Sequence, residues 1–231
     1  MATAGTIRGL VFDLDGLILD TEVPALATWQ EIYQERGGCL ELAAWAAGIG
    51  AGHDNDAFDP CAYLSKQIGR PIDSAALLAE YRRRYLATLS ALPALPGVES
   101  YLTDARRLGV RTAIASSSPR EWVFGHAGRL GLLPWFDAVI CAEDAPRSKP
   151  DPDLYLAVVA RLGLAPAEAI AFEDSPNGLL AAKRAGLYCV AVPNAVTRQL
   201  PLDSADRRLD SLADLPLSAL LAEVNSALVE R

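Results

Sequence analysis

The sequence has little positive charge, and this shortage excludes one large class of functions. Its 231 residues include 21 Lys and Arg against 29 Asp and Glu, so the net charge is −8 and the pI is about 4.8. Nonspecific nucleic-acid binding depends on clustered Lys and Arg, and we expect no nucleic-acid partner. An acidic surface also repels anionic substrates at long range, so any anion site has to be built locally.

Paired cysteines and long hydrophobic runs are also missing. Cys39, Cys61, Cys141 and Cys189 form no CxxC pair, which argues against a zinc site and against a disulfide framework. Reduced thiols of this kind are typical of the cytosol. The apolar run near the N-terminus is short and ends at Asp13, so it predicts neither a signal peptide nor a membrane span. We therefore expect a cytoplasmic protein without a membrane partner.

Short apolar runs recur between helical patterns, and a hydrophobic fraction of 51% is enough for a sizeable core. These runs cover residues 7–13, 110–116, 136–142, 169–174 and 188–193. The helical patterns before the second, fourth and fifth runs end at Gly109, Gly163 and Gly186, which are good C-cap residues. The alternation predicts an α/β fold, with a Rossmann-like parallel sheet and helices on both of its faces.

Residues 20–91 break this alternation, because they contain helical patterns and no convincing strand. One helix should stop at Gly37–Gly38, and another should start after a cap at Asp73 or Ser74. We predict a core domain of residues 1–19 and 92–231 and an all-helical cap domain of residues 20–91. The insert follows the first strand, at whose carboxyl end ligands bind in open α/β sheets, so it can cover a site as a lid.

Two acidic pairs follow predicted strands. Asp13 and Asp15 in DLDG are separated by one residue, which returns both to the same side in extended geometry. One could act as a nucleophile and the other as an acid/base group. Glu173 and Asp174 suit a hard divalent cation, Mg²⁺ before others. Each pair alone is also explained by the capping of a turn or a helix start.

The two remaining strand-end motifs carry hydroxyls and a cation. Ser116, Ser117 and Ser118 end the second run, where hydroxyls and free backbone N–H groups suit phosphate oxygens, although a simple N-cap before Pro119 explains them too. Lys149 precedes a proline and could pair with Asp13 and a substrate phosphate, although such a lysine is ordinarily solvated. Together the four motifs argue for one site, because crowded carboxylates need a cation beside them.

The order DLDGLILDTE, IASSS, SKPDPDLY and FEDSPNG resembles the haloacid dehalogenase (HAD) superfamily of phosphohydrolases. It is most similar to the branch with a helical cap between the first two motifs, which includes β-phosphoglucomutase and small phosphatases. The similarity covers nearly the whole chain, and four motifs in order make it specific. It does not indicate a substrate.

The resemblance implies a role for each motif residue. Asp13 would attack phosphorus and form an aspartyl-phosphate, while Asp15 would protonate the leaving oxygen and then deprotonate water. Mg²⁺ would be held by Asp13, by the main-chain carbonyl of Asp15 and by Asp174, with Glu173 as a ligand or beside one. Ser116, the Ser117 amide and Lys149 would hold the phosphoryl oxygens. The expected function is a Mg²⁺-dependent phosphatase acting on a small phosphomonoester, such as a sugar phosphate or a nucleoside monophosphate.

Departures from the family pattern narrow the alternatives. Dehalogenating members lack the second acid, which is present here as Asp15. The frequent Gly-Asp-x-x-x-Asp metal motif is replaced by Glu173-Asp174, with Gly178 at the position of the distal acid. The sugar-phosphate mutase has a histidine where this chain has Ala25, which speaks against a phosphomutase. A non-catalytic binding module is a third alternative, although no motif residue is lost.

The segment GIGAGHDNDAFD at residues 48–59 could bend over the site and contact a leaving group through Gly50, His53 or Asn55, although a solvated turn explains it as well. We assign no function to Trp122 or His126, which follow the serine motif. The expected partner is a small-molecule substrate, and the expected state is a monomer or a weak homo-oligomer.

Overall fold

The computed structural model describes residues 6–45 and 58–229 of the chain. The strands are β1 (Gly9–Phe12), β2 (Arg111–Ala115), β3 (Ala138–Ile140), β4 (Ala169–Glu173), β5 (Tyr188–Ala191) and β6 (Arg207–Arg208). The helices are α1 (Glu22–Glu35), α2 (Leu42–Trp45), α3 (Pro60–Ile68), α4 (Ser74–Ala91), α5 (Val98–Leu108), α6 (Arg120–Arg129), α7 (Asp153–Leu162), α8 (Pro176–Ala185) and α9 (Leu217–Val229). Short 3₁₀ helices lie at Leu133–Trp135, Ala142–Asp144, Pro166–Glu168, Thr197–Gln199 and Leu212–Asp214.

The six strands form one parallel sheet in the order β3-β2-β1-β4-β5-β6. β1 lies between β2 and β4, so Phe12 is level with Ile114 on one side and with Phe172 on the other. The predicted α/β fold and its five strands are confirmed. β6 was not predicted, because it consists of two exposed arginines at the sheet edge and has no apolar pattern.

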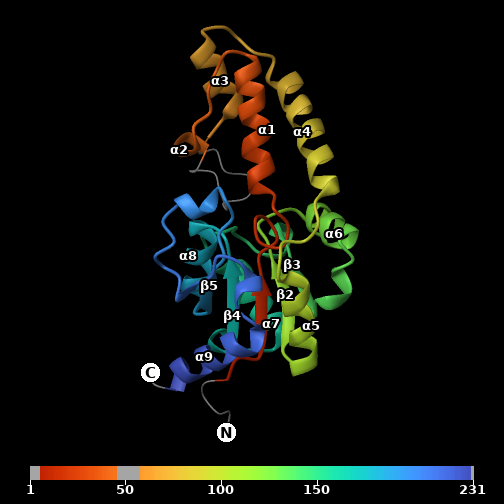
Figure 1. The fold of residues 1–231 in the computed structure, drawn as a ribbon, viewed down its shortest axis with the longest axis vertical. Coiled ribbons are helices and arrows are strands. Elements are labelled where there is room, and N and C mark those ends of the chain that lie inside the picture. The colour runs from red at the N-terminus through yellow and green to blue at the C-terminus, as the bar shows by residue number, and fades with distance from the viewer. Residues whose placement is uncertain (1–5, 46–57, 230–231) are drawn as a thin grey trace.

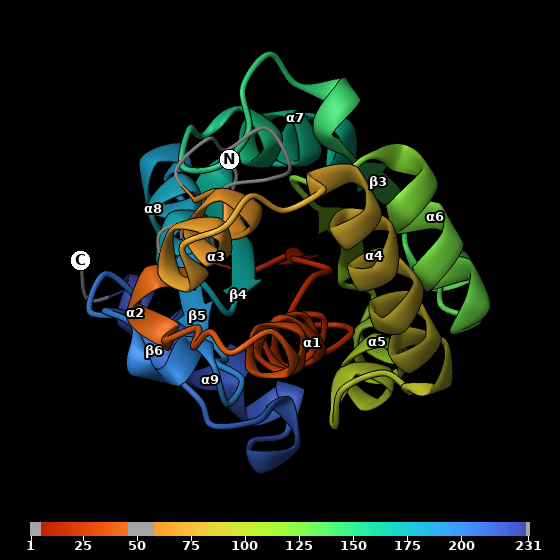
Figure 2. The same ribbon diagram turned by 90° about the horizontal axis from the view of Figure 1, so that it is seen from above.

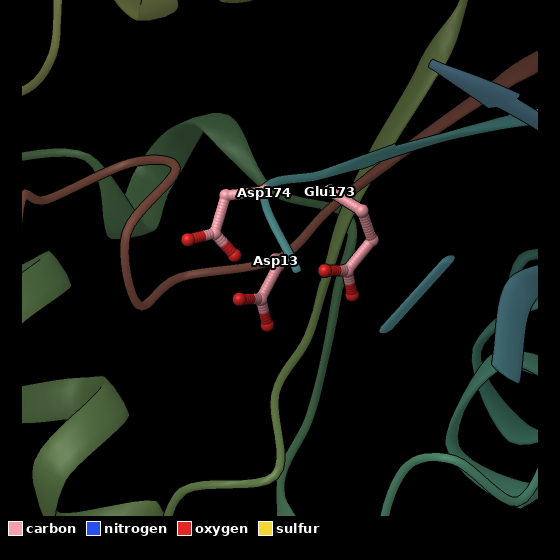
Figure 3. A group of neighbouring side chains, drawn as sticks. All are labelled: Asp13, Glu173 and Asp174. Carbon is pink, nitrogen blue, oxygen red and sulfur yellow. The ribbon is translucent and has the colours of Figure 1, made fainter. Parts of the chain in front are cut away.

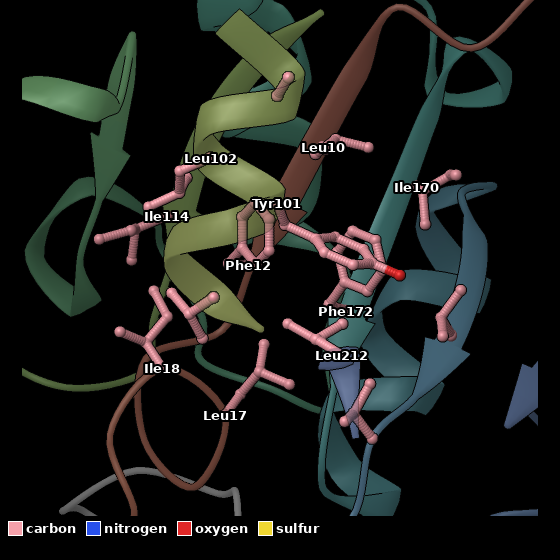
Figure 4. Close-up of a cluster of buried hydrophobic side chains, with 14 of the residues drawn as sticks. Leu10, Phe12, Leu17, Ile18, Tyr101, Leu102, Ile114, Ile170, Phe172 and Leu212 are labelled. Carbon is pink, nitrogen blue, oxygen red and sulfur yellow. The ribbon is translucent and has the colours of Figure 1, made fainter. Parts of the chain in front are cut away.

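Alternating side chains divide the core between the two faces of the sheet. One face carries large residues, including Leu10, Phe12 and Phe172, and packs against α5, α6 and α9 (Figure 4). Small residues such as Ala113 and Ala171 dominate the opposite face, which packs against α7 and α8. Both layers exclude water from the strands, which accounts for their nearly unbroken apolar sequence.

Helix ends follow the sequence signals with one exception. Gly109, Gly163 and Gly186 are left-handed C-caps as predicted, and Asp73 rather than Ser74 caps α4. The alternative that serines cap α6 is wrong, because Pro119 is the N-cap residue and makes no side-chain cap bond. The serine side chains are therefore available for other contacts.

Helices α1 to α4 lie beyond the carboxyl ends of the strands, as Figures 1 and 2 show from the side and from above. The described residues of 22–45 and 58–91 contain no strand. They build their own apolar cluster around Trp29, Ile32 and Tyr33, and Val196 from the loop after β5 joins it. The exact boundaries of a cap domain stay a prediction. Nowhere in the described ranges is a helix both long enough and apolar enough to cross a membrane.

Candidate active site

The carboxyl ends of β1, β2 and β4 bring the predicted site residues to one edge of the sheet. Asp13 directly follows β1, Ser116 follows β2, and Glu173 and Asp174 end and follow β4. The carboxylates of Asp13, Glu173 and Asp174 gather at one point, as Figure 3 shows, with one oxygen of each lying within 4.8 Å of the others. All three residues are buried.

The loop after β1 folds back on itself and fixes this geometry. The amides of Ile18 and Leu19 both donate to the Leu14 carbonyl, at 2.9 and 3.1 Å. Gly16 has φ +78°, and a Cβ there would collide with the Asp174 carboxylate, so only glycine fits. Leu17, Ile18 and Leu19 of this loop are buried, which explains why a loop next to the site is hydrophobic.

Lys149 is buried rather than solvated, so the surface alternative for this residue is wrong. Its Nζ donates to Asp13 Oδ1 at 2.6 Å, to Glu173 Oε1 at 2.6 Å and to the Ala115 carbonyl at 2.8 Å. Burial alone would lower the pKa of the ammonium, but Asp13 and Glu173 outweigh burial and raise it. Lys149 is therefore a fixed cation that bridges two of the carboxylates.

The carboxylates are only partly compensated by this single lysine. Burial raises the pKa of Asp13 well above its ordinary value, while Lys149 opposes that rise. Burial also raises the pKa of Asp174, and the charges of Glu22 and Asp13 add to the effect. A group of carboxyls that resists full ionisation is short of positive charge.

The side chain of Glu173 occupies space next to the first turn of α8, where Gly178 has no side chain. Its Oε1 accepts from the Tyr155 hydroxyl at 2.5 Å as well as from Lys149, and its Oε2 accepts from Ser175 at 3.3 Å. A Cβ at Gly178 would collide with this carboxyl group. The glycine at the family's distal-acid position is thus what allows Glu173 to fill the site.

Asp15 turns its side chain toward the serine loop and α6. Trp122 Nε1 donates to Oδ1 at 2.8 Å, while the hydroxyls of Ser118 and Ser116 donate to Oδ2 at 2.7 and 3.4 Å. Both carboxyl oxygens of Asp15 thus have partners, so the main-chain carbonyl is the group of this residue that is left to bind Mg²⁺, as the resemblance implies. Ser117 accepts from the Lys149 amide at 3.3 Å, so all three serines border the site.

Some contributing residues carried no usable sequence signal. Asn194, in the loop after β5, donates from Nδ2 to Asp174 Oδ2 at 2.8 Å and to the Gly16 carbonyl at 3.3 Å. Tyr155 is the exception, because it is the last residue of SKPDPDLY, the motif that contains Lys149. Trp122 is 107 residues from Asp15 in the chain. The predicted cap residues Gly50, His53 and Asn55 lie outside the described residues.

Comparisons with known proteins agree with this arrangement. A Bacillus subtilis (strain 168) protein named "Putative phosphatase YhcW" is 44% identical over 220 residues, which cover 95% of this chain and 99% of that protein. Hexitol phosphatase B of Escherichia coli (strain K12) is 30% identical over 236 residues, covering 96% of this chain and 100% of that protein. The chain is thus similar along its whole length to proteins named as phosphatases.

Solved structures and family models point the same way. The crystal structure of CbbY from Rhodobacter sphaeroides in complex with phosphate matches with a TM-score of 0.70 and 28% identity, covering 93% of this chain and 99% of that one. The family model for haloacid dehalogenase-like hydrolases matches residues 7–186, which include every described motif residue of the site. The protein therefore belongs to the haloacid dehalogenase-like hydrolase family.

Proposed function

We propose that this hydrolase is a Mg²⁺-dependent phosphatase that cleaves a small phosphomonoester through an aspartyl-phosphate on Asp13. The observation that carries the proposal is the buried group of Asp13, Lys149, Glu173 and Asp174 at the carboxyl edge of the sheet. The names of the relatives support phosphate esters as substrates, and that of hexitol phosphatase B favours a sugar phosphate over a nucleoside monophosphate.

The residues present fit Mg²⁺. The clustered side chains offer carboxylate oxygens, and oxygen ligands are what hard divalent cations prefer. Three buried acids share one lysine, and burial together with the charges of neighbouring acids raises the pKa values of Asp13 and Asp174. Asp13, Asp174 and the main-chain carbonyl of Asp15 would hold the ion, with Glu173 beside them. The bound ion would supply positive charge against the phosphoryl oxygens.

In the first half-reaction Asp13 attacks the phosphorus atom of the ester. Lys149 holds Oδ1 of Asp13, so we assign the attack to Oδ2. The bond from phosphorus to the leaving oxygen breaks as the new bond from Oδ2 forms, and Asp15 gives its proton to the departing alkoxide. Lys149 and the serine loop hold the phosphoryl group in place, so the protein contributes mainly positioning and charge.

In the second half-reaction water attacks the aspartyl-phosphate. Asp15, now ionised, takes the proton from the attacking water. The bond between phosphorus and Asp13 Oδ2 breaks, phosphate leaves and the Asp13 carboxylate is restored. Helices α1 to α4 lie over this edge of the sheet and would limit the entry of bulk water.

The test is phosphate release from a panel of sugar phosphates and nucleoside monophosphates with Mg²⁺ present. We expect turnover of at least one sugar phosphate, its loss on chelation of the metal, and a fall of more than about 10³-fold in Asp13→Asn. Unchanged release by Asp13→Asn would exclude the assigned nucleophile. Conversion of β-glucose 1-phosphate to glucose 6-phosphate would instead favour a phosphomutase, against which the buried Ala25 speaks.

A further inference from the structure

The side chain of Asp15 is held by groups of two different chemical kinds. Ser118 and Ser116 approach Oδ2 with hydroxyls, at 2.7 and 3.4 Å. Trp122 approaches Oδ1 with its indole N–H, at 2.8 Å. Each oxygen of the carboxyl group therefore has its own kind of partner. A serine hydroxyl can both donate and accept a hydrogen bond, whereas the indole N–H can only donate one.

This difference matters for a group that must both give and take a proton. A serine hydroxyl can donate to a carboxylate or accept from a carboxylic acid, so its bond to Oδ2 survives both states. An indole N–H can only donate, so its bond to Oδ1 is strongest while Oδ1 carries no proton and favours that state. The geometry thus assigns the transferable proton of Asp15 to Oδ2.

The ring of Trp122 is itself held by the helices above the site. It stacks on Tyr85 of α4, with centroids 6.0 Å apart and planes at 16°. Tyr85 stacks on Tyr81 at 5.3 Å, and Tyr81 stacks on Trp29 of α1 at 4.4 Å. Four aromatic rings, which we call the aromatic column (Trp29, Tyr81, Tyr85 and Trp122), run from α1 and α4 down to Asp15.

We propose that Trp122 is a positioning residue for the acid/base step: it keeps Oδ1 of Asp15 as an acceptor, directs the proton to Oδ2, and makes this orientation depend on the seating of α4 through Tyr85. The inference rests on the proposed function, in which Asp15 protonates the leaving oxygen. His126 also contacts the Trp122 ring, in an edge contact with a centroid distance of 4.2 Å.

The first test compares two leaving groups in Trp122→Phe, which keeps an aromatic ring and removes the donor. The alkoxide of a sugar phosphate needs a proton to leave, whereas p-nitrophenolate leaves without one. The value of kcat/KM covers only the steps up to release of this group, so it is insensitive to the later attack of water. The probes are p-nitrophenyl phosphate and the sugar phosphate that the wild type hydrolyses fastest.

We expect Trp122→Phe to lower kcat/KM for the sugar phosphate by about tenfold or more while changing that for p-nitrophenyl phosphate by less than about threefold. Tyr85→Leu keeps the donor and removes its stacking partner, so we expect the same selective loss. Trp135→Phe, which alters a ring stacked under Arg106 away from the site, is the matched control and should not change the ratio. Equal loss for both probes in Trp122→Phe would overturn the inference.

A second measurement needs no turnover. The sequence has four tryptophans, so the indole ¹H–¹⁵N spectrum of the full chain is simple to assign by single Trp→Phe variants. Without substrate, the Trp122 signal should move in Asp15→Ala, and the Trp135 signal should not. An unmoved Trp122 signal would contradict the contact. If no panel compound is hydrolysed but the Trp122 signal moves, the proposed function fails and the contact between Trp122 and Asp15 stands. If the wild type hydrolyses a sugar phosphate but Trp122→Phe loses kcat/KM equally for both probes, the proposed function stands and the role of Trp122 is excluded.

Discussion

At the scale of single residues, the site is defined by a shortage of positive charge. Lys149 gives its hydrogen bonds to Asp13, Glu173 and a main-chain carbonyl, so no bond is left over for the remaining acids. Glu22, at the start of α1, adds another carboxyl group close to Asp174. Burial and the charges of Asp15 and Asp20 raise the pKa of Glu22 to about 8.

The raised pKa of Glu22 predicts how stability depends on pH in the metal-free protein. Between its ordinary value of 4.5 and about 8, the folded protein keeps a proton that the unfolded chain releases. Folding is therefore most favoured below this window, and the free energy of unfolding should fall as the pH rises through it. In EDTA, the melting temperature of the wild type should fall more between pH 5 and about 8 than that of Glu22→Gln.

The matched control is Glu99→Gln, which changes an exposed glutamate in the first turn of α5. This variant should follow the wild-type slope. Parallel slopes for the wild type and Glu22→Gln would show that Glu22 does not hold a proton in the folded state.

Residues at strand ends could be predicted from the sequence, whereas their supporting partners could not. Asp13, Glu173 and Asp174 are conspicuous because each is an acidic group at the end of an apolar run, whereas Lys149 is linked to them only through the set of four motifs. Trp122 and Asn194 reach the site from a helix and a loop far away in the chain, and their local sequence is ordinary. Which oxygen of Asp15 each partner contacts depends on tertiary packing alone.

At the scale of elements, the start of α8 explains how the site accommodates Glu173. Ser175 caps this helix, Pro176 occupies its first turn and Gly178 follows. The absence of a side chain at Gly178 leaves room for the Glu173 carboxyl group, which then reaches Lys149 and Tyr155. Glu173 and a side chain at position 178 thus compete for one space.

This competition predicts that Gly178→Ala destabilises the protein, although a change from glycine to alanine in a helix ordinarily stabilises it. In a helix such a change ordinarily stabilises by about 0.5–1 kcal/mol. Here the new methyl group would displace Glu173, so we expect a loss of about 1–3 kcal/mol in the free energy of unfolding and at least about tenfold lower activity. Gly125→Ala in α6 is the matched control, because a Cβ there meets nothing within 4 Å and should stabilise.

Urea unfolding of both variants measures the two free energies. A double variant, Glu173→Gly with Gly178→Asp, exchanges the two positions of the acid and should recover part of the activity lost in Gly178→Ala. Stabilisation by Gly178→Ala equal to that by Gly125→Ala would contradict the crowding.

Element types were predictable where hydrophobic periodicity or a glycine cap marked them. The two-residue strand β6 could not be predicted, because its exposed arginines form no apolar pattern. Its strand conformation depends on pairing with β5. A serine cap for α6 was one of two interpretations of the sequence, and the structure excludes it, because Pro119 is the N-cap residue and Ser116 and Ser118 donate to Asp15.

At the scale of the whole molecule, this acidic chain buries a lysine at the carboxyl edge of the sheet, where the proposed function requires an anion site. Among the described residues, Lys149 is the one buried basic side chain, and the buried acids Asp13, Glu173 and Asp174 outnumber it. Helices α1 to α4 lie over the same edge of the sheet, and Val196 connects their apolar cluster to the loop that carries Asn194. The parallel sheet could be predicted, but how the helices seat on it could not, because the aromatic column spans segments that are distant in sequence.

The proposed function requires that Asp13 becomes phosphorylated during turnover. The most direct measurement is rapid acid quenching of the wild type with the fastest sugar phosphate and Mg²⁺, followed by mass spectrometry of the intact chain and of its peptides. We predict an increase equal to one phosphoryl group, located on the peptide that contains Asp13 and missing in Asp13→Asn. A phosphoryl group on another residue, or turnover by Asp13→Asn at the wild-type rate, would contradict this account.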